Sequence, residues 1–86
     1  MGKIVKNNFC WIIVNEWSCD DEAGVDIIKV TNDLETAFNY VKRYFIGHEI
    51  NFDELGSGMF RGTLHEKNDL TDCYNDITIT KHNILY

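Results

Sequence analysis

The sequence predicts a small α+β domain in which an antiparallel four-stranded sheet carries one helix packed on one face, in the order β-β-α-β-β. Three observations support this prediction: an apolar, β-branched and aromatic run near the N-terminus, an amphipathic helical pattern in the middle, and two strand-like segments in the second half. With 86 residues, we expect a single domain over residues 1–86 with one modest core.

The first two strands are predicted as a hairpin. The centre of Phe9–Trp17 has apolar residues at both odd and even positions, which is typical of a strand covered on both faces. An acidic connection, Ser18–Gly24, follows it, and Val25–Val30 is predicted as the second strand. A short link of this kind favours antiparallel pairing.

The helix is predicted over Asp33–Ile46. Asn32 and Glu35 have the spacing of a capping box, and Gly47 is a typical helix stop. Apolar residues recur at steps of three and four and form one stripe, which we expect to lie on the sheet. These residues are Leu34, Ala37, Phe38, Val41, Tyr44 and Phe45.

The second half is predicted as an irregular segment, His48–Gly58, followed by strands at Met59–His65 and Ile77–Leu85 joined across an acidic loop. Four strands and one helix leave one sheet face uncovered. Aromatic residues exposed there would indicate a partner or a homodimer, whereas the alternative is that they belong to the single core. The aromatic residues in question are Trp11, Trp17, Phe60 and Tyr74.

Composition excludes several classes of function. Fourteen acidic residues against eight basic ones give a formal net charge of -6, so we expect no direct nucleic-acid binding. No apolar run approaches the roughly 20 residues that span a bilayer, and no signal peptide is evident, so we expect no membrane insertion and a cytoplasmic location. Cys10, Cys19 and Cys73 are odd in number and widely spaced, which predicts reduced thiols.

No catalytic or cofactor site is predicted. The carboxylates of the first hairpin match no known calcium or magnesium loop, and we expect no metal. His48, His65 and His82 lie far from one another, and none has the spacing of a zinc-ligand pair. No orienting group can be placed for a histidine–cysteine pair either, so the sequence predicts a protein that is not an enzyme.

Acidic residues gather in two segments. Seven lie between Asn15 and Glu35, where only Lys29 is basic, and a second group consists of Glu66, Asp69, Asp72 and Asp76. If both hairpins point to the same side, their carboxylates would form an array able to compete with phosphates for a basic groove, as DNA mimics do. The alternative is that the acidic loops only keep the domain soluble.

The segment from Trp11 to Ala37 resembles the opening of small orphan proteins of low-GC Gram-positive bacteria and their phages. The residues that carry this resemblance are Trp11–Trp17, Asp20, Asp21, Gly24, Val25, Ile27, Val30, Glu35 and Ala37. It covers about half of the chain, ends before Gly47 and names no catalytic residue. It implies a mobile-element origin, in which small acidic proteins are similar in size and charge to anti-CRISPR and other anti-defence inhibitors.

The leading hypothesis is a phage-encoded module that inhibits a host protein, such as a nucleic-acid-binding or defence protein, by charge mimicry. The expected contact residues are Glu16, Trp17, Asp20, Asp21, Glu22 and Asp26. The alternative is a homo-oligomeric structural or regulatory module that buries the uncovered sheet face against a second copy.

Overall fold

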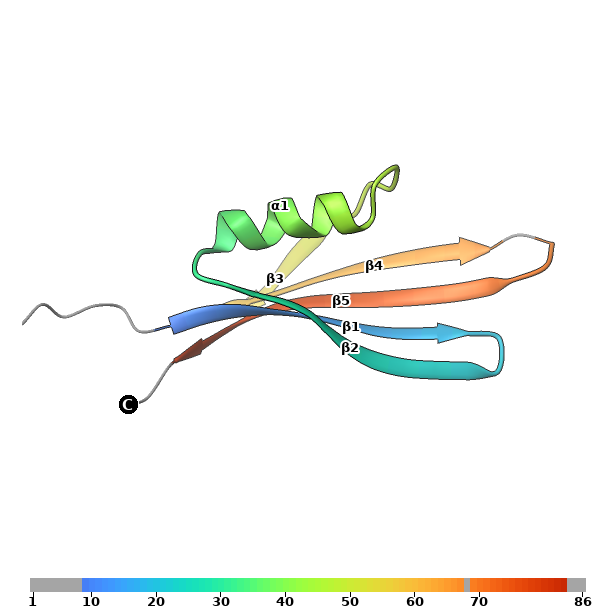
Figure 1. The fold of residues 1–86 in the computed structure, drawn as a ribbon, viewed down its shortest axis with the longest axis horizontal. Coiled ribbons are helices and arrows are strands. Elements are labelled where there is room, and N and C mark those ends of the chain that lie inside the picture. The colour runs from blue at the N-terminus through green and yellow to red at the C-terminus, as the bar shows by residue number, and fades with distance from the viewer. Residues whose placement is uncertain (1–8, 68, 84–86) are drawn as a thin grey trace, which may run out of the picture.

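The computed structural model describes residues 9–67 and 69–83, where five antiparallel strands form one sheet and a single helix covers part of one face (Figure 1). The strand order is β2-β1-β5-β4-β3, so the hairpins β1–β2 and β4–β5 lie side by side. The elements are β1 (Phe9–Cys19), β2 (Glu22–Thr31), α1 (Leu34–Tyr44), β3 (Phe52–Gly56), β4 (Met59–Lys67) and β5 (Asp72–Asn83).

The predicted four-stranded sheet is wrong, because a fifth strand, β3, lies inside the segment His48–Gly58 that was expected to be irregular. β3 pairs with β4, with Phe52 opposite Gly62. Only the first of its five residues is half-buried, so the sequence of β3 shows no alternation of buried apolar and exposed polar residues. Its strand conformation depends on pairing with β4.

The strands are also longer than predicted. The expected connection Ser18–Gly24 shrinks to the turn Asp20–Asp21, since Cys19 pairs with Glu22. Asp20 has a φ of 52°, a left-handed conformation that Asp adopts more readily than most residues. β5 begins at Asp72, well before the predicted start at Ile77, and the predicted end at Leu85 lies outside the described residues.

The helix is confirmed with different ends. Asp33 is the N-cap, and its carboxylate accepts a hydrogen bond from the backbone N–H of Thr36 at 2.7 Å. The expected capping box of Asn32 and Glu35 is therefore wrong by one position. α1 ends at Tyr44, and Gly47 follows with a φ of 87° in the turn that leaves the helix.

The core lies between α1 and the sheet face that we call the covered face. Ile13, Ile77 and Ile79 are fully buried there, together with Ala37 and Val41 of the helix. The predicted apolar stripe of the helix therefore lies on the sheet, except for Tyr44, which is 53% exposed. No helix in residues 9–67 and 69–83 is long and apolar enough to cross a membrane.

Of the four aromatic residues considered above, some belong to the core and others are partly or fully exposed. Trp11 is only 8% exposed and belongs to the core, and Phe60 packs against it with 6.1 Å between ring centroids. Trp17 is half-buried, and Tyr74 is exposed. On the opposite, open face, β2 exposes aliphatic side chains at Val25, Ile27 and Val30.

Candidate functional site

Both long hairpins turn at the same end of the sheet, away from α1, which lies over the other half (Figure 1). Direct antiparallel pairing of β1 with β5 places the Asp20–Asp21 turn next to the start of β5. The backbone N–H of Asp20 donates a hydrogen bond to the backbone oxygen of Asp72 at 3.2 Å. The condition for a shared carboxylate array, two hairpins that point to one side, is therefore met.

A disulfide between Cys19 and Cys73 joins β1 to β5 at this end. The two residues are directly opposite in the ladder, with Cα atoms 4.1 Å apart. The expectation of reduced thiols is wrong for this pair, while Cys10 is free. Sequence spacing does not reveal the bond, because the register of the strands brings together two residues 54 positions apart.

We call the carboxylate-bearing tips of the two hairpins the acidic end. Its members are Asp20, Asp21, Glu22, Glu66, Asp69 and Asp72. All of them are exposed except the half-buried Asp72. Lys67 is the only lysine or arginine in residues 19–22 and 65–73, so the acidic end carries a large excess of negative charge.

Two histidines border the acidic end. His65 contacts the carboxylate of Asp72 through Nε2, and its ring stacks on Tyr74 with 3.9 Å between centroids. His48 lies 3.4 Å from the carboxylate of Glu66. Both histidines therefore lie directly against carboxylates of the acidic end.

The predicted contact residues do not form one surface. Asp20, Asp21 and Glu22 are together in the acidic end. Trp17 lies on the covered face, where its Nε1–H donates to a carboxylate oxygen of Asp26 at 3.1 Å. Its indole lies over Gly24, since a Cβ there would come within 2.7–2.9 Å of three ring atoms.

Glu16 lies on the open face, near an ion pair that the sequence did not reveal. Arg61 donates from Nε and Nη2 to both oxygens of Asp76, at 2.8 and 2.7 Å. Hydrogen bonding to Asp76 and then its charge raise the pKa of Arg61, and the charge of Glu16 adds to the shift. Asp76 belongs to the second acidic group in the sequence, but this pairing removes it from the carboxylate array.

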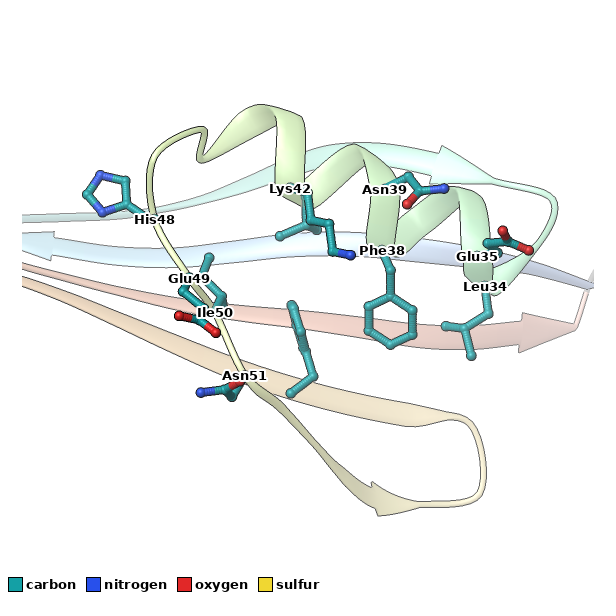
Figure 2. A pocket seen from close by; sticks show the side chains of 11 residues that line it. Leu34, Glu35, Phe38, Asn39, Lys42, His48, Glu49, Ile50 and Asn51 are labelled. Carbon is teal, nitrogen blue, oxygen red and sulfur yellow. The ribbon is translucent and has the colours of Figure 1, made fainter.

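A groove separates α1 from the segment that leads into β3, with a volume of about 900 Å³ (Figure 2). Leu34, Phe38 and Ile50 are among its apolar lining residues. Glu35, Glu49 and Lys42 also line it and carry charges of both signs. This mixture favours neither an anionic nor a cationic ligand, so the groove does not indicate a particular class of substrate.

Within residues 9–67 and 69–83, no group of three or more His, Cys, Asp or Glu side chains is arranged to hold a metal ion. The carboxylates of the acidic end are thus distributed over a surface instead of converging on one point. Such a surface can attract a basic partner through charge.

The features that sequence reasoning missed here, the disulfide and the Arg61–Asp76 pair, both arise from strand register. No family model, no curated protein and no solved structure matches the chain. The geometry of the acidic end is therefore the observation that bears most directly on function.

Proposed function

We propose that this protein is a non-enzymatic binding module whose acidic end occupies a basic, nucleic-acid-binding groove of a partner protein. The observation that carries the proposal is the hydrogen bond from the Asp20 N–H to the Asp72 carbonyl, which holds the two acidic hairpins next to each other. The disulfide at Cys19 and Cys73 holds the same two strands together covalently. The carboxylates therefore belong to one continuous surface.

The density of charge supports mimicry of a phosphate backbone. The acidic end spans the neighbouring strands β2, β1, β5 and β4, which is three strand spacings or about 14 Å. Six carboxylates against one lysine leave five negative charges on that width. This is one charge per roughly 3 Å, within a factor of about two of the one per 1.7 Å along duplex DNA.

The partner is a protein with a basic surface, because the acidic end repels nucleic acids and attracts Lys- and Arg-rich grooves. The resemblance to proteins of low-GC Gram-positive bacteria and their phages favours a host nucleic-acid-binding or defence protein as that partner. In this role, the module inhibits its partner by occupying the groove that nucleic acid would fill.

The test is affinity capture from a lysate of a low-GC Gram-positive bacterium, with elution by a salt ramp and by duplex DNA. The tip variant is Asp20→Asn, Asp21→Asn and Glu22→Gln, in which asparagine at the first position tolerates the positive φ as aspartate does. The control variant is Glu49→Gln, Asp53→Asn and Glu54→Gln, on exposed residues near β3. Both variants remove three negative charges, so they separate the acidic end from net charge alone.

We expect the parent and the control variant to retain the same nucleic-acid-binding protein and to release it to salt or DNA. At about 1 kcal/mol for each solvent-exposed charge contact, the tip variant loses about 3 kcal/mol, or roughly a hundredfold in affinity. Equal retention by the tip variant would refute the proposal. Equal loss in both variants would reduce the effect to net charge and would also refute it.

A further inference from the structure

Within residues 9–67 and 69–83, β2 and β3 are the two edges of the sheet, and they differ in kind. β3 has five residues and exposes Asp53 and Glu54, features that protect a sheet edge against pairing. β2 has ten residues, and Val25 and Ile27 are 64% and 70% exposed. A long edge strand with exposed apolar side chains is a template for one more strand.

The backbone of β2 has hydrogen-bonding groups directed to the open edge. Cys19 and Cys73 are opposite each other with Cα atoms 4.1 Å apart, the close spacing of a pair that exchanges no backbone hydrogen bonds. The backbone N–H and C=O of Cys19 therefore point toward its β2 partner, Glu22. From Glu22 onward, every second residue of β2 directs its own N–H and C=O toward β1 in the same way. The residues that face the edge are Ala23, Val25 and Ile27.

One antiparallel register lets β2 pair with β2 of a second copy. When Val25 lies opposite its counterpart, Asp26 lies opposite Gly24 and Ile27 opposite Ala23, so apolar side chains meet on the open face. Moving the axis by one residue places Asp26 opposite Asp26 or Glu22 of the second copy, which brings like charges together. In the registers between these, Val25 lies opposite Gly24 or Asp26 of the second copy. Such a register would place the open face of one copy beside the covered face of the other.

A β-bulge in β2 adds a charge match to this register. Ile13 and Val14 of β1 pair with Lys29 and Ile27, so Ile28 is an extra residue. Beyond the bulge, Lys29 therefore lies opposite Glu22 of the second copy, and both are on the covered face. The twofold symmetry produces this ion pair twice, once at each end of the paired segment.

We propose that two copies of this chain associate through β2 in this register and form one continuous ten-stranded antiparallel sheet, with Val25 at the twofold axis. The occupant is a second copy because the segment is complementary to itself in backbone groups, apolar side chains and charge. Glu22 is the one member of the acidic end that takes part in the pairing, and the other five carboxylates lie outside the paired segment, so the dimer does not depend on the proposed partner.

The test is sedimentation equilibrium of the oxidised parent and of two variants at one position. Val25→Pro removes a backbone N–H that points to the sheet edge and leaves the hydrogen bonds between β2 and β1 intact. Proline is tolerated at such a position of an edge strand. Val25→Thr is the matched control, since it keeps the N–H and a β-branched side chain. We expect a dimer for the parent and for Val25→Thr, and a dissociation constant at least tenfold higher for Val25→Pro.

A charge exchange keeps the inference testable if Val25→Pro does not fold. Glu22→Lys and Lys29→Glu, each alone, place like charges opposite each other and weaken the dimer, whereas the double variant restores opposite charges and the parent affinity. A parent that remains monomeric at millimolar concentration would overturn the inference. So would a folded Val25→Pro variant that dimerises like the parent, or a double variant no better than the single ones.

Discussion

Breaking the Cys19–Cys73 disulfide is expected to lower the free energy of unfolding by as much as about 4 kcal/mol. The bond closes a loop between residues 54 positions apart. A loop of this size loses about 14 cal/mol/K of chain entropy in the unfolded state, which is about 4 kcal/mol at 25 °C. Repulsion among the carboxylates of the acidic end also lowers the free energy of unfolding of the reduced protein. After reduction, only non-covalent contacts hold the hairpin tips together against this repulsion.

The measurement is urea unfolding of the oxidised and the reduced protein, both in a Cys10→Ser background that leaves only the bonded pair. Separately, thiol titration in denaturant gives the redox state of the parent protein, which keeps Cys10. The untreated parent should show one free thiol, that of Cys10, and the reduced parent three. A double Cys19→Ser and Cys73→Ser variant should match the reduced form in stability.

Three free thiols in the untreated parent would show that the bond does not form and would remove the covalent link between the hairpins. An unfolding midpoint that does not change on reduction would contradict the entropic argument. It would mean that the disulfide constrains the unfolded chain less than closing a loop between residues 54 positions apart predicts.

Three further changes probe other parts of the structure. Gly24→Ala brings a Cβ to 2.7–2.9 Å from the ring of Trp17 and should displace the indole, at a cost of about 1 kcal/mol and with a red shift of its fluorescence. Ile79→Ala empties a fully buried site and should cost about 2–5 kcal/mol in urea unfolding, and a smaller loss would contradict the placement of the core. Hydrogen bonds from the Thr36 side chain and backbone lower the pKa of Asp33. Its stabilising effect is therefore present above about pH 4 and is lost as pH falls through the folded-state pKa, so the parent should lose stability in acid relative to Asp33→Asn.

The helix could be predicted from the sequence because its signals are local. Apolar residues at a period of 3.6, basic residues in the last turn and a glycine stop all lie within one short segment. The cap was misplaced by one residue because Asn32 and Asp33 both cap helices well, and only the backbone conformation of Asp33 distinguishes them.

The fifth strand could not be predicted because its signal is non-local. Phe52 is the only apolar residue of β3 directed at the core, where its ring meets Phe38 edge to face at 5.2 Å. Gly62 opposite it leaves room for that ring, since a Cβ there would lie 3.1 Å from two ring atoms. This fit exists only after β3 and β4 have paired, so neither segment reveals it alone.

The candidate site was predictable in its charge and unpredictable in its pairings. The sequence showed two acidic groups, and adjacent hairpins bring most of them to one end. The register of β4 and β5 decides that Asp76 binds Arg61 instead of joining them. The register of β1 and β5 likewise decides that Cys19 meets Cys73.

The role of the acidic end is tested most directly by amide chemical-shift mapping of the isotope-labelled protein with the captured partner at low and high salt. Binding through both hairpins predicts shifts at residues 19–22 and 65–73 together, fading as salt rises and reversed by duplex DNA. Shifts confined to the open face or to the groove beside α1, with the acidic end unchanged, would contradict the proposed function.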